Sequence, residues 1–223
     1  MTTDIQSATL LTIQVGQPRQ MTDEGWPELR TGPWTSAIIK ENVAGPVWLS
    51  RTNVEGDAQG NPAVHGGPDK AALAYSAAHY PLWNAELARE FPYGAFGENL
   101  TIDGQDEDSV CIGDTYSIGD DVIVQVASPR SPCWKIARRW QIKDLTARVD
   151  DTGRTGWYLR VLREGQLEPG QRITLTDRPH PEWTVTRATD TMLSRRADMT
   201  AANALAQLAE LADSWKQQLL TPA

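Results

Sequence analysis

A run of β-branched residues that ends at a proline constrains this chain most strongly. Residues 122–127 are apolar and β-branched almost without interruption, which predicts a buried strand. Pro129 lacks the amide donor that a strand ladder needs, so the strand should end there. Ser131 can then cap a helix whose first position is Pro132, which puts Cys133 in the first helical turn. The sequence therefore places one thiol at a strand-to-helix junction.

The charge around this thiol is opposite to that of the whole chain. Residues 130–139 carry four cations and no acidic residue, whereas the formal net charge of the chain is −8. Cations and the positive end of a helix both favour a thiolate. An ordinary small buried cysteine beside a solvated helix face is the alternative. The two prolines, the helix start and the local charge favour a functional thiolate at Cys133, with the helix continuing through Ile136 and Trp140.

Composition and length exclude several classes of protein. The chain has 223 residues and 40% hydrophobic content, which fit one medium domain with an appendage. The N-terminus lacks the basic region of a signal peptide, and no apolar run reaches the ~20 residues of a membrane helix. We therefore expect a soluble cytoplasmic protein that does not bind membranes. A pI near 4.9 argues against duplex nucleic acid as a partner. The two cysteines, Cys111 and Cys133, form neither a disulfide framework nor a zinc pattern.

A glycine-rich turn spans residues 65–70, His-Gly-Gly-Pro-Asp-Lys. Its two glycines permit backbone conformations and close approaches that other residues forbid. His65 and Lys70 can therefore converge on a ligand from a tight turn. A purely structural turn fits the same residues equally well.

A second glycine-rich segment, residues 94–100, places Gly97 before an acid and an amide. Glu98 offers acceptors and Asn99 offers both donors and an acceptor, a combination that suits the edge of a polar heterocycle. The alternative is that Glu98 caps the turn or pairs with a nearby arginine. The segment is a candidate binding element on either view of Glu98.

A third turn, residues 152–158, contains Arg154, Thr155 and Gly156 ahead of a predicted strand. Arg154 can meet a phosphate group from such a turn, because a guanidinium donates two parallel hydrogen bonds to an anion. An arginine at the protein surface is the commoner outcome. The turn joins the other two as a candidate element of one site.

The spacing of strands and turns predicts a mainly β fold. Short β-branched runs separated by glycine turns at hairpin spacing are typical of an antiparallel barrel. Predicted strands cover residues 8–15, 35–39, 46–49, 71–75, 122–127, 159–162 and 172–176, and short helices cover 79–91 and 144–149.

From Arg178 onward the chain becomes rich in alanine and leucine. Leu205, Leu208 and Leu211 recur at helical spacing, so we expect two or three short helices whose apolar stripe covers the barrel or another chain. We divide the chain into a barrel domain, residues 1–180, and a C-terminal helical extension, residues 181–223.

Four motifs together resemble those of MOSC-domain proteins. They are His65-Gly66-Gly67-Pro68-Asp69-Lys70, Gly94-x-Phe96-Gly97-Glu98-Asn99-Leu100, Pro129-Arg130-x-Pro132-Cys133-x-Lys135 and Thr155-Gly156-Trp157. Their order and approximate spacing match the family, and the resemblance spans residues 35 to 220. The helical extension makes the chain similar to the YiiM-like branch in particular. Four linked motifs are far more specific than any one alone.

The resemblance implies a MOSC-type β-barrel with short helices that binds the molybdenum cofactor, molybdopterin-bound molybdenum. It further implies that Cys133 is the thiolate ligand of the metal and the catalytic residue. Soft thiolate suits a thiophilic metal, and an anionic pterin needs cations and backbone donors around it. The residues that we expect to hold the cofactor are His65, Lys70, Gly97, Glu98, Asn99, Arg130, Ser131, Lys135, Arg154, Thr155 and Gly156.

The resemblance also implies an activity, the reductive detoxification of N-hydroxylated compounds such as hydroxylamino base analogues. Amidoxime-reducing components are the related eukaryotic proteins. The chain has neither an iron–sulfur cysteine pattern nor the glycine fingerprint of a flavin or nicotinamide site. We therefore expect an external electron-donor protein as a partner, with a homodimer as an open option.

Two other functions fit the same residues. Cys133 can carry a persulfide, which would make the protein a sulfur carrier. The barrel can instead bind or store the cofactor without turnover.

Overall fold

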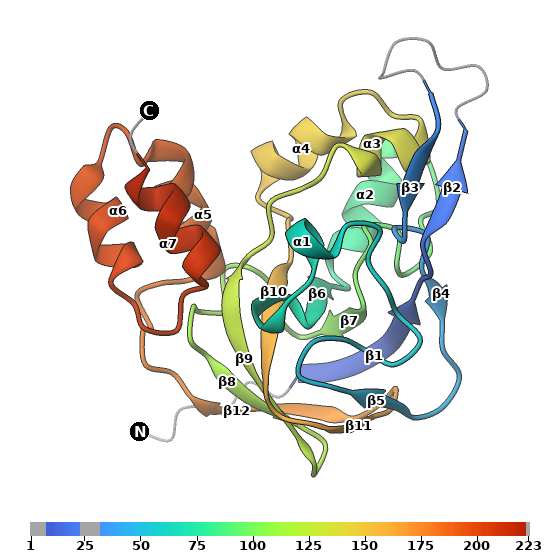
Figure 1. The fold of residues 1–223 in the computed structure, drawn as a ribbon, viewed down its shortest axis with the longest axis horizontal. Helices are drawn as coiled ribbons and strands as arrows, with labels where there is room; N and C mark the ends of the chain where they lie inside the picture. The colour runs from blue at the N-terminus through green and yellow to red at the C-terminus, as the bar shows by residue number, and fades with distance from the viewer. Residues whose placement is uncertain (1–7, 23–31, 222–223) are drawn as a thin grey trace.

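A closed barrel of seven strands forms the centre of the protein (Figure 1). The computed structural model describes residues 8–22 and 32–221. The barrel strands are β1 (Ala8–Val15), β6 (Ala72–Ser76), β7 (Leu100–Asp103), β8 (Thr115–Ile118), β9 (Val122–Pro129), β10 (Trp157–Arg163) and β12 (Arg172–Asp177). Their order around the barrel is β12, β8, β9, β10, β6, β7 and β1. All neighbours are antiparallel except β6 and β7, which are parallel.

The first and the last barrel strands pair with each other and close the ring. Ala8 lies opposite Ile173 and Thr9 opposite Arg172. A β-bulge in β1 shifts its register with β7 between Leu10 and Thr12, and such bulges bend a strand around a barrel. The predicted β-barrel is therefore confirmed, including its closure by the strand at 172–176.

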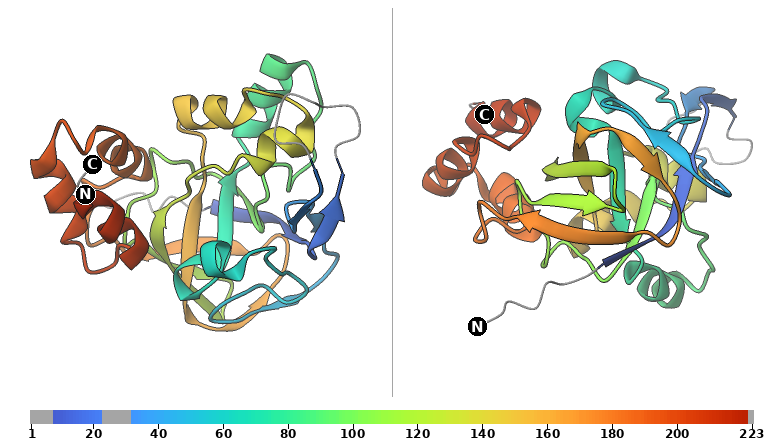
Figure 2. Two further views of the ribbon diagram at one scale, coloured as in Figure 1. Left: turned by 45° about the horizontal axis from the view of Figure 1, so that its top comes forward. Right: turned by 90° about the horizontal axis from the view of Figure 1, so that it is seen from below.

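Short strands and helices surround the ring. β4 (Glu41–Asn42) extends β1, β2 (Arg19–Met21) pairs with β3 (Trp34–Ser36), and β5 (Val47–Leu49) pairs with β11 (Gly165–Leu167). The helices before the extension are α1 (Pro62–His65), the 3₁₀ turn η1 (Pro68–Lys70), α2 (His79–Leu87), α3 (Lys135–Trp140) and α4 (Leu145–Thr152). Figure 1 and Figure 2 show α2, α3 and α4 together at one end of the barrel.

The C-terminal extension consists of three helices, α5 (Val185–Ser194), α6 (Met199–Ala206) and α7 (Asp213–Leu220). They gather beside the barrel, apart from α2, α3 and α4 (Figure 2). Leu205 and Leu211 are buried in one continuous cluster with barrel residues such as Val124. The Ala212 amide also donates to the carbonyl oxygen of Ala127 on β9 across 2.8 Å. The leucine stripe of the extension thus covers the barrel.

Three local predictions were wrong in detail. α3 begins at Lys135 rather than at Pro132, and no side chain caps it. Residues 130–133 are irregular, and Trp134 precedes the first helical residue as the N-cap. Cys133 therefore precedes the helix, although its carbonyl accepts the Ile136 amide at 3.0 Å and opens the turn.

The second difference is in α2, which ends at Leu87 because Ala88 adopts a left-handed conformation with φ of 47°. Leu82, assigned to its apolar side, is 46% exposed, whereas Tyr80 and Trp83 are buried. Thirdly, the strand predicted at 35–39 ends at Ser36. Residues 37–40 leave the small sheet, and Ala37, Ile38 and Lys40 line a cavity.

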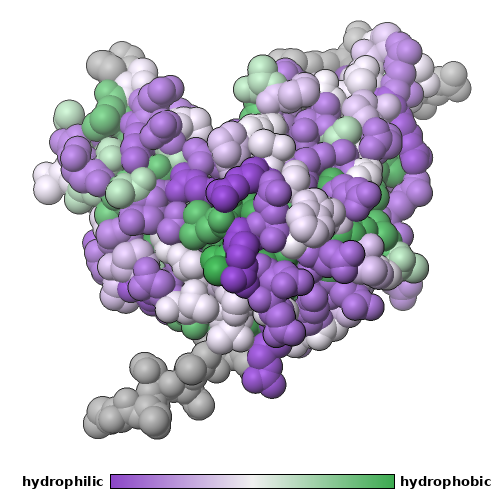
Figure 3. Space-filling view, turned by 60° about the horizontal axis from the view of Figure 1, so that its bottom comes forward, coloured by the Kyte–Doolittle hydropathy of each residue, from purple (hydrophilic) through white to green (hydrophobic). Residues whose placement is uncertain are grey.

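Most of the visible surface is polar. The face shown in Figure 3 is largely hydrophilic, with a smaller apolar area near its middle. Within residues 8–22 and 32–221, no helix has both the length and the apolar character that crossing a membrane requires.

Candidate functional site

One cavity collects most of the residues that the motifs singled out. Its wall combines the segment after β3, the loop before α1, α1 and η1, the turn before β7, the segment after β9, and β10. Eight predicted residues line it: His65, Lys70, Gly97, Asn99, Arg130, Ser131, Cys133 and Lys135. The four others, Glu98, Arg154, Thr155 and Gly156, are outside this lining. Motifs far apart in the sequence therefore do meet at one place.

Three cations in the cavity wall are held by backbone carbonyls rather than by carboxylates. Lys70 Nζ donates to Val64 O at 2.7 Å, and Lys135 Nζ donates to Thr35 O at 2.9 Å. Arg130 Nη2 donates to Phe96 O at 3.0 Å. None of the three forms an ion pair with another described residue. Their positive charge is therefore available to an anion in the cavity.

Arg130 carries the most specific signal for a ligand. It is only 5% exposed, and its Nη1 is buried without a hydrogen-bond partner among the described residues. Leaving a buried donor unpaired costs about 1–3 kcal/mol, more when the donor is charged. A guanidinium fork that lines a cavity with one arm unused is suited to a bound anion.

The same positive charge affects the pKa of His65. Burial lowers the pKa of its imidazole, and the neighbouring cations Lys135, Lys70 and Arg130 lower it further. The ring is therefore neutral at neutral pH and can accept or donate a hydrogen bond in the cavity.

Cys133 is half-buried and lines the cavity. It lies two residues before the six-residue helix α3 and shares the cavity wall with His65, Lys70, Arg130 and Lys135. Cys111 differs in every respect. It is buried, its Sγ contacts Pro181 O at 3.5 Å near the start of the extension, and burial raises its pKa to about 11.

Glu98 and Asn99 shape the wall through contacts inside the protein. Glu98 accepts the Gly94 amide at 2.7 Å and the Phe96 amide at 3.1 Å, so it caps its own turn, as the alternative assignment had it. Asn99 Oδ1 accepts the Leu73 amide at 3.1 Å. Both amide hydrogens of Asn99 are used as well, by Gln14 O and by Asp57 Oδ2. Neither side chain has a spare donor for a heterocycle edge.

The third turn, residues 152–158, contributes Tyr158 to the cavity lining, but its residues 154–156 lie outside it. Arg154 points away from the cavity, because it pairs with Glu86 at 2.7 Å and lies over the Trp83 ring. Thr155 is fully buried. Gly156 donates its amide to Glu107 Oε1 at 2.7 Å. The structure thus places residues 154–156 outside the ligand cavity, against the expectation of a direct phosphate contact.

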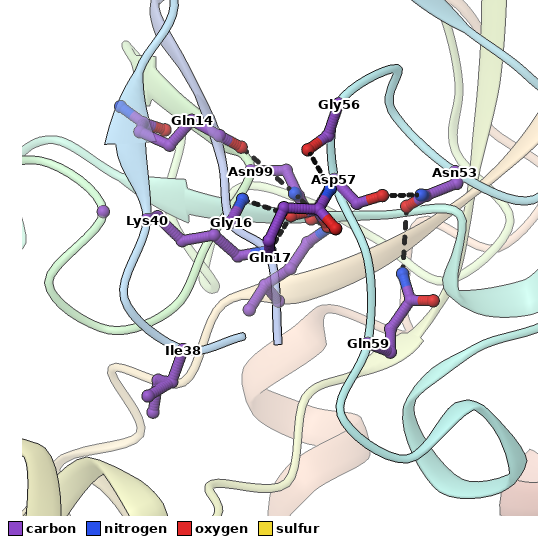
Figure 4. A network of polar contacts seen from close by, with 12 residues as sticks. Gln14, Gly16, Gln17, Ile38, Lys40, Asn53, Gly56, Asp57, Gln59 and Asn99 are labelled. Atoms are coloured by element: carbon purple, nitrogen blue, oxygen red, sulfur yellow. Dashed lines mark hydrogen bonds and ion pairs between the residues drawn. The ribbon is translucent and has the colours of Figure 1, made fainter. Parts of the chain in front are cut away.

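A buried ion pair that no sequence motif predicted lies in the same wall. Lys40 Nζ pairs with Asp57 Oδ1, and the two side chains are 7% and 2% exposed. Asp57 Oδ1 also accepts the Gly16 amide at 2.7 Å (Figure 4). Tyr158 and Gln59 line the cavity too. Gly56 before Asp57 was the only local hint, because both charges lie in irregular segments.

Comparison with known families finds two adjoining matches. A model described as MOSC domain matches residues 61–174, and one described as YiiM-like, 3-alpha helix domain matches residues 183–221. MOSC domains resemble the C-terminal domain of molybdenum-cofactor sulfurases, which supports a role for the chain related to that cofactor.

Individual proteins agree with the family match. A Bacillus subtilis protein named uncharacterized protein YflK is 37% identical over 212 residues, 95% of this chain and 93% of that protein. A Gibberella moniliformis protein named reductase is 39% identical over 183 residues, 81% of this chain but 32% of that longer protein. The crystal structure of YiiM from Geobacillus stearothermophilus is similar with a TM-score of 0.79 and 33% identity, covering 95% of this chain and 97% of its own.

Proposed function

Because the chain belongs to the MOSC family and carries the YiiM-like helical extension, we propose that it is a molybdenum-cofactor-dependent reductase of N-hydroxylated compounds. The observation that carries the proposal is the buried, unpartnered Nη1 of Arg130 in a cavity that also contains Cys133. A cavity built this way is prepared for an anion beside a thiol.

The residues of the cavity fit the cofactor. Its phosphate and dithiolene groups are anionic, and Arg130, Lys70 and Lys135 offer three cations without carboxylate partners among the described residues. Cys133 would supply the thiolate ligand, since soft thiolates suit this class of metal. When bound, the cofactor would supply the two-electron chemistry.

The protein would bind and orient both the cofactor and the substrate. The overall reaction is R–NH–OH + 2 e⁻ + 2 H⁺ → R–NH₂ + H₂O, in which the N–O bond breaks and the oxygen leaves as water. Ile38, Leu73 and Phe96 give the cavity apolar surface that can pack against the organic part of such a substrate.

The electrons would come from another protein. About two thirds of the longer relative named reductase lies outside its match to this chain. The name reductase therefore describes a protein with more than a MOSC domain. A separate donor is proposed because the sequence has neither an iron–sulfur cysteine pattern nor the glycine fingerprint of a flavin or nicotinamide site.

The test combines metal analysis with turnover. Freshly purified protein should contain molybdenum and pterin, and it should reduce an N-hydroxylated base analogue when a reduced viologen dye supplies electrons. Protein without molybdenum but with cyanide-labile sulfur on Cys133 would instead identify a sulfur carrier. Protein that retains the cofactor but shows no turnover would identify a binding module.

A further inference from the structure

The cavity has two electrostatically different sides. The cations whose charge reaches His65 are Lys135, Lys70 and Arg130. The charged groups around Lys40 are a different set, namely Asp57, Glu98 and Arg139. The side near His65 therefore carries an excess of positive charge. On the side near Lys40, the carboxylates of Asp57 and Glu98 balance the charges of Lys40 and Arg139. An anionic cofactor suits the first side, which leaves the second for a neutral substrate.

Lys40 is held rigidly on the second side. Figure 4 shows Lys40, Asp57, Gly16 and Asn99 converging from different segments of the chain. A Cβ atom on Gly16 would lie 3.2 Å from Lys40 Cδ, and one on Gly94 would lie 3.1 Å from Lys40 Cβ. The lysine stem therefore runs against two positions where only glycine leaves enough room.

The ammonium has hydrogen-bonding capacity to spare. An ammonium has three donors, and among the described residues Lys40 Nζ has one hydrogen-bond partner, Asp57 Oδ1. Asp57 is held by two further hydrogen bonds, because it also accepts from the Gly16 amide at 2.7 Å and from Asn99 Nδ2 at 2.9 Å. Since Lys40 lines the cavity, its remaining donors can reach a bound molecule.

Stability alone is a poor reason for this pair. Taking two charges out of water costs several kcal/mol per ion, and a buried ion pair is often no more stable than apolar residues of similar volume. Here both partners are buried, and they line a cavity rather than pack within the hydrophobic core. A functional reason for a buried lysine at this position is therefore worth seeking.

We propose that Lys40, held by Asp57, donates a proton to the oxygen atom that leaves the N-hydroxylated substrate. This inference rests on the proposed function. The N–O bond breaks and an external electron-transfer protein supplies two electrons. The leaving hydroxyl takes one proton from Lys40 and departs as water, and the nitrogen takes the second proton from solvent to give the amine. Lys40 is left as a neutral amine beside Asp57 and recovers its proton from solvent.

The other proton-bearing side chains of the wall are less suited to this step. His65 is neutral at neutral pH because burial and three cations lower its pKa. Lys70 and Lys135 belong to the cationic side and donate to backbone carbonyls. Burial lowers the pKa of both Lys40 and Lys70, and a lower pKa makes a lysine a better acid near neutral pH. Lys40 differs from Lys70 in its ion pair with the buried carboxylate of Asp57, which fixes its position.

Lys40→Met is the first test, because it removes the proton and keeps the length of the side chain. General acid catalysis typically contributes 10²- to 10⁴-fold, so we expect kcat to fall about that much with KM changed less than about threefold. Molybdenum and pterin content should equal those of the wild type. The fall in wild-type kcat at alkaline pH should disappear in the variant.

Chemical rescue separates proton donation from a structural effect. Primary amines added to Lys40→Ala should restore part of kcat, with a rate that depends on the pKa of the amine. A structural role would give rescue that depends on amine size alone. Arg178→Met is the matched control, since it breaks the Arg178–Asp114 pair (2.6 Å) outside the cavity. It should lower stability and leave the pH profile unchanged.

A second readout does not need turnover. The chain has five lysines, Lys40, Lys70, Lys135, Lys143 and Lys216, so their side-chain carbons can be followed individually by NMR. One resonance that is absent in Lys40→Met should titrate below the ordinary lysine range. A Lys40→Met protein with wild-type kcat, or a Lys40 resonance in the ordinary range, overturns the inference alone. Wild-type protein without molybdenum or turnover overturns the proposed function, and the inference with it.

Discussion

The backbone amide of Arg130 donates to the carbonyl oxygen of Gly156 across 3.0 Å. Gly156 in turn donates its own amide to Glu107 Oε1, and His79 contacts the other oxygen of Glu107 at 2.6 Å. The arginine with the unpaired Nη1 is thus fixed through its backbone by a buried polar chain. The turn at residues 152–158, which the sequence suggested as a ligand-binding loop, instead holds the backbone of Arg130 in place.

Gly156→Ala should strongly destabilise the protein. The new Cβ would lie 2.4 Å from the Ala74 carbonyl oxygen, at a residue whose φ is +78°. We expect a loss of at least about 2 kcal/mol in the free energy of unfolding, measured with denaturant. Gly153→Ala is the control, since Gly153 has a φ of +67° but nothing within 4 Å of its Cβ position. Equal losses in both variants would contradict the close packing of Gly156.

Arg130→Met should separate stability from cofactor binding. Loss of a charge-assisted contact weakens affinity roughly tenfold to hundredfold, so cofactor content should fall. The free energies of unfolding of the cofactor-free variant and the cofactor-free wild type should agree within about 1 kcal/mol, because the substitution also removes a buried donor that has no partner among the described residues. Arg154→Met, at a residue paired with Glu86 outside the cavity, should keep normal cofactor content. Normal pterin content in Arg130→Met would mean that Arg130 holds no anion.

Cys133→Ser should lose molybdenum and all activity while the fold stays intact. A neutral hydroxyl replaces a soft anionic ligand at little change in volume, so the expected defect is chemical. Metal analysis and circular dichroism measure the two effects. Cys111→Ala should retain the metal, and a Cys111 variant as inactive as the one at Cys133 would refute the assignment.

The two thiols should also differ in reactivity. Burial raises the pKa of Cys111 to about 11, so its reactive thiolate is scarce until the pH approaches that value. In cofactor-free protein at pH 8, iodoacetamide should therefore modify Cys133 and spare Cys111, as read by mass spectrometry of peptides. Modification of Cys111 should begin only as the pH rises toward 11. Equal labelling at pH 8 would contradict the burial of Cys111.

Leu205→Ala should show that the extension stabilises the barrel without holding the cofactor. Leu205 is fully buried in the cluster shared with barrel strands, and such a truncation costs about 2–5 kcal/mol. Molybdenum content per folded molecule should not change, because no residue of the extension up to Thr221 lines the cavity. Leu220→Ala is the control, at a side chain of a residue that is 52% exposed, and should change stability by less than about 0.5 kcal/mol.

Local sequence patterns predicted most of the barrel strands, though not β7, and the cationic side of the cavity. Residues 122–127 and 172–176 lie in β9 and β12, because β-branched runs between turn residues are a local signal. Arg130, Cys133 and Lys135 were found together because they are neighbours in the sequence.

The opposite side of the cavity had no such signal. Lys40 and Asp57 lie 17 positions apart in irregular segments, and their pairing depends on how the barrel folds. Gly156 was assigned to the site for the opposite reason, because its sequence motif was visible but its role was not. A glycine that allows close backbone packing cannot be distinguished by local sequence from one that contacts a ligand. The direction in which Arg154 points was likewise decided by Glu86, a residue on a distant helix.

The pairing of β1 with β12 has a consequence for how the chain folds during synthesis. The strand made first waits for a partner that begins at Arg172, so the ring cannot close until most of the chain exists. Contacts of such long sequence separation make folding slow, and an unpaired strand edge can recruit other chains meanwhile. We expect refolding to be slow and yields to fall as protein concentration rises, with aggregates forming from intermediates whose first strand still has an open edge.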